Sequence, residues 1–504
     1  MTRSAGAVRI VSGTTPPVLA TACGARQDGH VRPQRVLIVG AGHVGLYVAL
    51  RLSRRLRRGE AEVTVVDAQP TMTYQPFLPE AAAGSVEPRH AVVPLRRALR
   101  RCRVLTGRIT AIDHARRTAT FQPVVGPARE LGYDHVVVAP GSVARTLPIP
   151  GLREHAVGFK TMGEAIWLRN RVLERLDIAA ATDDPRVRRR ALTFVFVGAG
   201  YAGVEALGEM EDMARAALRY YPELNDRDMR WVLVEATQRV LPEMGPDMGA
   251  YTLSQLRSRG MDIRLGTRLE SCVDGVVELS DGDRFEADTI VWTAGVRPHP
   301  LVEATDLPRD ERGRITCLPT LQVADGDRVV PGAWSAGDCA AVPDLAATEP
   351  GATCPPNAQH AVRQAVRLAD NLLAVMRGRQ PRPYRHRHAG TVASLGLHQG
   401  VAKVYGVRVR GWLAWFLHRT YHMSRIPSLD RKVRVVADWT LALFLRREVV
   451  SLGELHRPRS RFTGVTPAHP AAAPGDRGQG PDARVAGSGA HVGRSGTRAA
   501  ARVD

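Results

Sequence analysis

The sequence predicts an α/β protein in which one strand–glycine turn–helix unit occurs twice and an amphipathic helical region follows. Two observations predict the repeated unit: apolar strands run directly into glycine turns at 40–45 and 198–203, and an acidic residue ends the strand after each helix. A stretch rich in Trp, Leu and Phe at 411–427 predicts the helical region. At 504 residues the chain is long enough for several domains.

The first unit begins with "RVLIVGAGHVG" at residues 35–45. A uniformly apolar strand runs into Gly40, Gly42 and Gly45, which open an apolar helix. Glycines let backbone N–H groups and a helix N-terminus approach a pyrophosphate. The next strand ends at Asp67, where a carboxylate can accept hydrogen bonds from a ribose. This order predicts a Rossmann-like dinucleotide-binding domain, although a tight structural turn would explain the glycines alone.

The second unit repeats the pattern with Gly198, Gly200 and Gly203, and its second strand ends at Glu235. Two dinucleotide sites are therefore expected, and the most plausible pair is a resident flavin and a diffusible nicotinamide. Glu235 disfavours the 2′-phosphate of NADP by charge repulsion, although Arg239 could soften that preference. We expect NADH.

A third signal distinguishes the two sites. The segment "GAWSAGDCAA" at 332–341 reads as a short buried strand that ends in Gly337 and Asp338. An aspartate at such a point is well placed to bind the ribityl chain of FAD, and the alternative is an ordinary acidic turn residue. The first unit and this segment are expected to bind FAD, and the second unit NADH.

Seven motifs follow one another along the chain: "VGAGHVG", "YQPFLPEAAAG", "YDHVVVAPGS", "VGAGYAGVE", "VWTAGVRP", "WSAGD" and "PPNAQHAVRQA". Through them the chain resembles type II NADH dehydrogenase, the non-pumping NADH:quinone oxidoreductase, among the flavin-dependent pyridine nucleotide oxidoreductases. The resemblance covers roughly residues 34 to 456.

The resemblance implies a discontinuous FAD-binding domain and a C-terminal membrane-facing region. The FAD domain is expected to consist of two segments, 34–150 and 300–400, with the NADH domain at 151–299 inserted between them. The membrane-facing, quinone region is expected at 401–457. The ends, 1–33 and 458–504, are rich in small and polar residues and are expected to be disordered.

The resemblance also implies the reaction: hydride passes from NADH to FAD, and two electrons then reduce a quinone, menaquinone or ubiquinone. Glu205 resembles the family glutamate near the nicotinamide and the proton path, and a helix N-terminal acid is the alternative. Gln359 and Gln364 resemble residues at the quinone end of the flavin, and an exposed polar helix face is the alternative. Gly141 is expected at the adenosine end of FAD, and Gly295 in the NADH site.

The stretch "GWLAWFLHRTYHMSRIP" at 411–427 predicts an amphipathic helix. On a helical projection the apolar side chains Trp412, Leu413, Phe416 and Met423 share one side, and His418, His422 and Arg425 share the other. By the resemblance, this helix docks on the cytoplasmic face of the plasma membrane. Core packing and a homodimer interface would use the same side chains, and a homodimer is expected as well.

The charge, the cysteine spacing and the lengths of the apolar runs limit which partners and which compartment are expected. The net charge is +20, yet only three of the 70 basic residues are lysines, so the charge reflects an arginine bias and no nucleic acid is expected. The six cysteines show no C-x-x-C spacing, which favours a reducing compartment and no metal site. No uncharged apolar run approaches the roughly 20 residues of a spanning helix, so any membrane contact is peripheral.

Two alternatives stay open. One is a soluble NAD(P)H-dependent flavin reductase that serves a ferredoxin-like or other protein acceptor. The other is a redox-sensing protein that binds FAD and NADH and turns over slowly.

Overall fold

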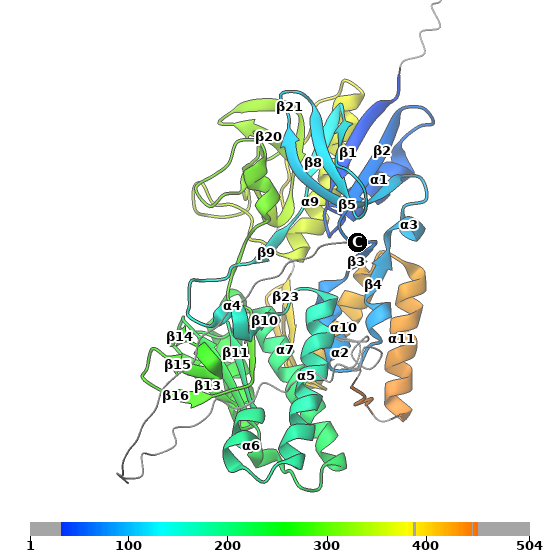
Figure 1. Ribbon diagram of the computed structural model, residues 1–504. Coiled ribbons are helices and arrows are strands. Elements are labelled where there is room, and N and C mark those ends of the chain that lie inside the picture. Colours follow the sequence, from blue (N-terminus) through cyan, green and yellow to red (C-terminus); the bar gives the residue numbers. More distant parts are fainter. Residues whose placement is uncertain (1–31, 387–389, 446, 452–504) are drawn as a thin grey trace, which may run out of the picture. The chain divides into compact units, whose positions relative to one another are not determined.

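The computed structural model describes residues 32–386, 390–445 and 447–451. Its two largest sheets, of eight and five strands, are separate from each other and are each covered by helices (Figure 1). Of the expected N-terminal extension only residues 32 and 33 are described, and the expected tail at 458–504 lies outside the described residues.

The first sheet has eight strands in the order β20-β21-β8-β1-β2-β5-β6-β7. Its strands are β1 (Gln34–Val39), β2 (Ala61–Asp67), β5 (Arg103–Asp113), β6 (Thr118–Pro123), β7 (Arg129–Gly132), β8 (His135–Val138), β20 (Gln322–Asp325) and β21 (Arg328–Ser335). The five strands from β21 to β5 are parallel, and β21 pairs with β8 through Ala333 and Val136. Strands β20 and β21 follow the second unit in sequence, yet they belong to the same sheet as β1.

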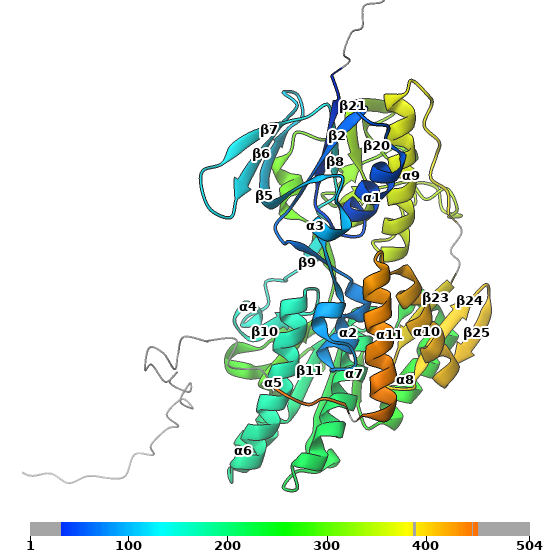
Figure 2. The same ribbon diagram turned by 90° about the vertical axis from the view of Figure 1, so that its right-hand side faces the viewer.

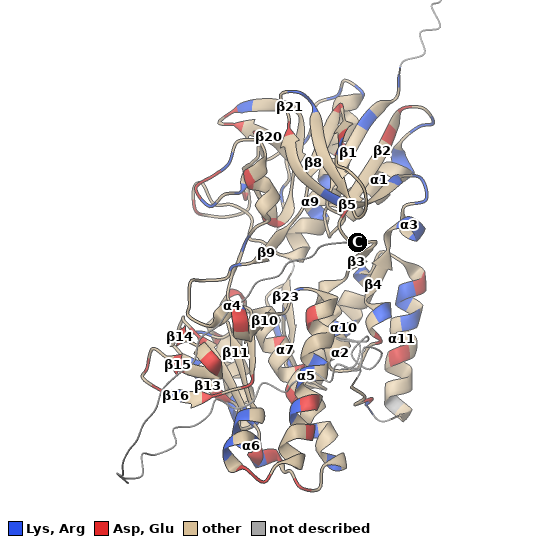
Figure 3. Cartoon of the chain, in the orientation of Figure 1, with Lys and Arg blue, Asp and Glu red and all other residues tan. Residues whose placement is uncertain are grey.

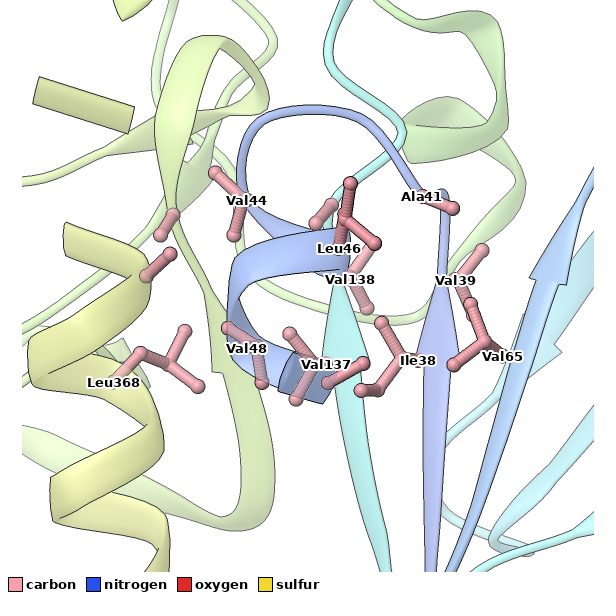
Figure 4. Packing of buried hydrophobic residues seen from close by; sticks show 14 of the residues in the cluster. Ile38, Val39, Ala41, Val44, Leu46, Val48, Val65, Val137, Val138 and Leu368 are labelled. Carbon is pink, nitrogen blue, oxygen red and sulfur yellow. The ribbon is translucent and has the colours of Figure 1, made fainter. Parts of the chain in front are cut away.

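Helix α1 (Gly45–Arg55) lies between this sheet and α9 (Ala358–Met376), as Figure 4 shows. Its Leu46 and Val48 are fully buried, and Leu368 of α9 packs in the same cluster. Because both faces of β1 are covered, the strand is apolar throughout its last four residues.

The second sheet has five parallel strands in the order β10-β17-β11-β12-β13. They are β10 (Ala156–Gly158), β11 (Thr193–Val197), β12 (Arg230–Glu235), β13 (Asp262–Leu265) and β17 (Thr289–Trp292). Its helices are α5 (Met162–Ala181), α6 (Pro185–Ala191), α7 (Tyr201–Ala217) and α8 (Pro246–Ser258). The predicted fold class, two Rossmann-like α/β units with C-terminal helices, is confirmed.

Short elements connect and extend the two units. They are β3 (Thr71–Thr73), β4 (Val92–Pro94), β9 (Ser142–Ala144), β14 (Leu269–Ser271), β15 (Val276–Leu279), β16 (Arg284–Glu286), β18 (Val296–Pro298), β19 (Ile315–Thr316), β22 (Ala340–Ala341), α2 (Leu78–Ala82), α3 (Leu95–Ala98) and α4 (Leu152–His155). Helix α2 packs against α5 and α7, so a segment that follows the first glycine unit contributes to the core of the second.

The C-terminal region consists of a three-stranded antiparallel sheet and two helices. The strands are β23 (Gly390–Ser394), β24 (Gly400–Val404) and β25 (Val407–Arg410), and the helices are α10 (Gly411–Arg425) and α11 (Leu429–Phe444). Helix α10 packs on all three strands, and α11 lies next to α10 (Figure 2). Residue 400, where a boundary was expected, is the first residue of β24, which pairs with β23.

Candidate functional site

The first glycine turn joins β1 to α1, and two of its glycines are required by the fold. A Cβ on Gly45 would lie 1.8 Å from the carbonyl oxygen of Gly40, and one on Gly40 would lie 2.4 Å from that of Ala139. Gly40 also has a φ of +90°, which favours glycine. Gly42 differs, because a Cβ there would meet nothing within 4 Å. Its backbone therefore faces open space at the N-terminus of α1.

The second glycine turn, between β11 and α7, has the same geometry. A Cβ on Gly203 would lie 1.9 Å from the carbonyl oxygen of Gly198, whose φ is +106°. Gly200, like Gly42, has open space around it. Each turn thus presents free backbone at a helix N-terminus, the arrangement that binds the pyrophosphate of a dinucleotide.

An acidic residue is held beside each turn in the same way. The two oxygens of Asp67 accept hydrogen bonds from the backbone N–H groups of Ala41, at 2.6 Å, and Gln69, at 2.8 Å. The two oxygens of Glu235 accept from Ala199, at 2.7 Å, and Thr237, at 2.8 Å. Burial raises the pKa of Asp67, and the two backbone hydrogen bonds oppose that shift. Both acids are therefore held at the rim of a glycine turn by backbone N–H groups.

Gly337 and Asp338 lie beside the first turn and are fixed by side chains from distant segments. The N–H of Gly337 donates to Oε1 of Gln364 on α9 at 2.8 Å. The hydroxyl of Ser142 donates to Oδ2 of Asp338 at 2.6 Å, and Nζ of Lys160 donates to the same hydroxyl. A Cβ on Gly337 would press on the side chain of Val44, inside the first turn. The structure thus brings Gln364 and Asp338 to the same site as the first glycine turn.

Three further residues that the sequence assigned to a site are Gly141, Gly295 and Gln359. Gly141 has a φ of +75° and nothing within 4 Å of a Cβ position. Gly295, with a φ of +81°, follows β17 near Gly198, whose Cβ would lie 2.8 Å from the nitrogen of Ala294. Gln359 lies apart from Gln364: its amide donates to the carbonyl of Gly390 at 3.2 Å.

Glu205 lies inside the protein and not at a helix cap. The first turn of α7 contains no acidic residue, and the Glu205 side chain is only 10% exposed. It accepts a hydrogen bond from the N–H of Ser394 at 3.1 Å and forms an ion pair with Nε2 of His418 at 3.1 Å. The helix-dipole alternative therefore does not describe its surroundings.

Glu205 belongs to a buried charge cluster, which we define as Glu80, Glu205, Glu209, His418, Arg419 and Arg447. Glu80 on α2 pairs with Arg419 at 3.1 Å and accepts from Nε1 of Trp439 at 2.8 Å. Glu209 pairs with Arg447 at 3.2 Å. Three carboxylates from α2 and α7 are thus matched by three basic side chains from α10 and the segment after α11.

Aromatic and imidazole rings connect this cluster to the first glycine turn. His422 lies 4.6 Å from His418 and 6.5 Å from Tyr74, between ring centroids, and Tyr74 lies 5.8 Å from His43 of the turn. Burial lowers the pKa of His43 to about 4, and it lowers the pKa of His422 well below its ordinary value. The lowered pKa favours the neutral form of both rings, in which one ring nitrogen donates a hydrogen bond and the other accepts one.

The sequence assigned no role to the two histidines of α10. Trp412, Leu413 and Phe416 are exposed and His418 on the opposite side is buried, as the expected separation of the two sides requires, but Arg425, which was expected on the side of His418, is exposed. Met423 differs from the expectation, because it packs partly against the core of the first unit. The sequence did contain a signal for this internal polar site: His418 and His422 lie opposite the apolar side chains of the same helix.

Comparisons with known proteins agree with this geometry. The sequence model of the pyridine nucleotide-disulphide oxidoreductase family matches residues 34–365. The chain is 28% identical over 431 residues to a type II NADH:quinone oxidoreductase of Mycobacterium tuberculosis, covering 82% of this chain and 89% of that protein. It is 27% identical over 429 residues to a probable NADH dehydrogenase of Dictyostelium discoideum, covering 84% and 92%.

Solved structures share the fold. NDH2 from Plasmodium falciparum in complex with NADH matches with a TM-score of 0.77 at 16% identity, covering 83% of this chain and 100% of that one. A ferredoxin reductase from Rhodopseudomonas palustris matches with a TM-score of 0.57 at 20% identity, covering 74% and 88%. Because proteins with different names share this fold, the fold alone does not identify the electron acceptor of this chain.

Proposed function

The chain belongs to the pyridine nucleotide-disulphide oxidoreductase family, and from this premise we propose that it is an FAD-dependent NADH:quinone oxidoreductase that pumps no protons. One observation carries the proposal: two glycine turns of the same geometry, each with its own acid, occur in a chain whose C-terminal helix α10 reaches Glu205. The near full-length likeness to a type II NADH:quinone oxidoreductase supports the acceptor.

FAD is assigned to the first glycine turn with Asp67, Gly141, Gly337, Asp338 and Gln364, and NADH to the second turn with Glu235 and Gly295. The residues fit these groups, because Gly42 and Gly200 leave open backbone where a diphosphate would lie. FAD held by these residues would supply the redox chemistry, which is acceptance of a hydride from NADH and delivery of two electrons to a quinone. The chain itself contributes binding, orientation and exclusion of water.

Glu205 and His418 are the proposed proton-holding pair. Forming a quinol from NADH and a quinone consumes one proton from solution, and a buried site needs a group that holds it. The pKa of His418 is raised: burial is the largest single effect and opposes the charged ring, but the charge and hydrogen bond of Glu205 together with the charge of Glu80 outweigh it. Gln359 and Gln364 are proposed at the quinone end of the site: Gln364 contacts Gly337 beside the first glycine turn, and Gln359, five residues earlier on α9, contacts Gly390 of the C-terminal region.

Quinones reside in membranes, so the proposal includes peripheral attachment to the cytoplasmic face of the plasma membrane. Trp412, Leu413 and Phe416 are exposed, and the rings of Trp412 and Phe416 stack at 5.5 Å. No described helix is long and apolar enough to cross a membrane. A homodimer is also proposed, and its interface would compete with the membrane for this apolar surface.

Steady-state NADH oxidation by the purified, FAD-loaded protein tests the function. With equal concentrations of menadione, ferredoxin and oxygen as acceptors, we expect turnover with menadione to be the fastest. Faster reduction of ferredoxin would replace the proposal with a protein-acceptor reductase. Rapid bleaching by NADH without turnover on any acceptor would favour a redox sensor.

A further inference from the structure

One lysine of the second unit reaches the acid that is assigned to FAD in the first. Lys160 lies between β10 and α5, and its Nζ donates a hydrogen bond to the hydroxyl of Ser142. That hydroxyl donates to Oδ2 of Asp338 at 2.6 Å. A serine hydroxyl has one hydrogen, and an ammonium can only donate, so Lys160 directs the Ser142 hydrogen toward the carboxylate. The three groups form one directed chain that ends at Asp338.

A lysine is an unusual residue in this chain, which has only three among its 70 basic residues. Figure 3 shows basic residues on outer helices such as α6 and α11, and nearly all of these are arginines. Lys160 is instead half-buried between the two units. An ammonium is a compact charge that a single hydroxyl can hold, whereas a guanidinium is a planar fork that needs more room and more acceptors. The position beside Ser142 therefore suits a lysine.

The backbone of Lys160 is held from both units. Its N–H donates to Oε2 of Glu164, the glutamate of the capping box of α5, at 2.8 Å. Its carbonyl oxygen accepts from Nε2 of Gln75 at 3.2 Å, and Gln75 lies directly before α2. The protein fold itself therefore sets where the Lys160 side chain begins.

The chain of three groups leaves one oxygen of Asp338 available. Within residues 32–386, 390–445 and 447–451, no group donates a hydrogen bond to its Oδ1. Burial lowers the pKa of Lys160, and the charges of Asp338 and Glu164 oppose that shift. A carboxylate with one oxygen fixed and the other available is suited to accept a hydrogen bond from a ligand hydroxyl.

We propose that Lys160 is a positioning residue of the FAD site: through the hydroxyl of Ser142 it fixes the carboxylate of Asp338, whose other oxygen accepts a hydroxyl of FAD. The unit that binds NADH thereby contributes a residue to the retention of FAD. This inference rests on the proposed function only in that FAD is assigned to the first glycine turn.

Release of FAD from the loaded, full-length protein tests the proposal, and the rise in flavin fluorescence measures its rate. The variants are Lys160→Met, Lys160→Arg, Ser142→Ala and the double variant Lys160→Met/Ser142→Ala. Lys403→Met is the matched control, because Lys403 is an exposed lysine on β24. Apoprotein melting points close to that of the wild type exclude a folding defect in each variant.

Lys160→Met and Ser142→Ala should each release FAD about tenfold faster than the wild type, the contribution of one hydrogen bond to a charged group. The double variant should release it no faster than the faster single variant, because Lys160 acts through Ser142. Lys160→Arg should lie between the wild type and Lys160→Met, since it keeps the charge and changes the shape. The control Lys403→Met should match the wild type.

Wild-type release of FAD from Lys160→Met or from Ser142→Ala would overturn the proposal, and the second variant decides alone if the first does not fold. Release about a hundredfold faster from the double variant, the product of two tenfold effects, would show that the two side chains act independently. Equal losses in Lys160→Met and Lys160→Arg would assign the effect to packing and not to charge.

The proposed function fails by a different result. A wild type that purifies without flavin and binds no added FAD would refute it. A wild type that binds FAD and reduces menadione, together with a Lys160→Met variant that keeps FAD equally well, would refute the role of Lys160 alone.

Discussion

Glu205 lies inside the protein, and its ion-pair partner there is His418 on α10. The two side chains are 10% and 2% exposed, so water contributes little to their solvation. Removing one partner of a buried ion pair typically costs about 3–5 kcal/mol, because the other charge is left without compensation. The pair therefore links the second Rossmann-like unit to the C-terminal region.

The charges around His418 predict how stability depends on pH. Burial opposes its charged form, Glu205 and Glu80 favour that form, and Arg419 disfavours it, with a raised pKa as the result. A group with a raised pKa in the folded state stabilises the fold fully below its unfolded pKa of about 6.5. That stabilisation is lost as the pH rises through the folded pKa.

Glu205→Gln should therefore lower the thermal midpoint more at about pH 6 than at about pH 9. The midpoints of variant and wild type can be compared by calorimetry at both pH values. Asp288→Asn is the control, since its partners Arg175 and Arg190 are guanidinium groups that stay charged at both pH values, and its loss should not depend on pH. A loss in Glu205→Gln that is equal at both pH values would show that His418 is not the charged partner.

Glu235 predicts the choice of nicotinamide. Both of its oxygens are occupied by backbone N–H groups of Ala199 and Thr237, so the carboxylate is fixed at the rim of the turn. Glu235→Gln should raise the ratio of kcat/KM for NADPH over NADH by about tenfold, which corresponds to ~1.4 kcal/mol. Asp67→Asn is the control, because it should affect FAD retention and leave this ratio unchanged. An unchanged ratio in Glu235→Gln would assign selectivity to another residue.

At the scale of elements, some glycines of the two turns are needed for folding, and others leave open space for a ligand. Gly45→Ala should prevent correct folding of the first unit, since its Cβ would lie 1.8 Å from a carbonyl oxygen. Gly42→Ala and Gly200→Ala meet no protein atom, so both proteins should fold. Gly42→Ala should purify with little FAD, and Gly200→Ala should keep FAD and show a KM for NADH raised by about tenfold or more.

Absorbance of bound flavin and steady-state kinetics measure these two effects separately. Apoprotein melting points close to that of the wild type would show that neither alanine disturbs the fold. If Gly42→Ala kept its FAD and raised only the KM for NADH, the assignment of the two turns would have to be exchanged.

These turns could be predicted from the sequence because all their determinants are contiguous. Each turn lies within a few residues of its strand and helix, and its acid follows at the end of the next strand. The buried charge cluster could not be predicted in this way, because Glu80 and Arg419 are far apart in sequence. For α10, periodicity gave the residues that share a side but not which side faces the core, since both sides contain bulky rings.

At the scale of the whole molecule, the C-terminal region completes the interior. Arg419 and His418 supply positive charge to Glu80 and Glu205, and Ile426 and Val435 join the core of the first unit. Deleting everything from residue 411 onward would leave buried carboxylates without partners, so such a truncation measures stability more than membrane contact. Membrane contact has to be tested with the region in place and only its surface changed.

Trp412→Ser combined with Phe416→Ser makes that change, because both rings are about half exposed, at 57% and 45%. The double variant should melt like the wild type and float on vesicles several-fold less, since each ring loses its burial in the acyl layer. Trp415→Ser is the matched control: Trp415 is 7% exposed and contacts Arg419, so its loss should lower the melting point. Analytical ultracentrifugation separates the competing use, because a dimer interface would be lost in the double variant while flotation stayed normal.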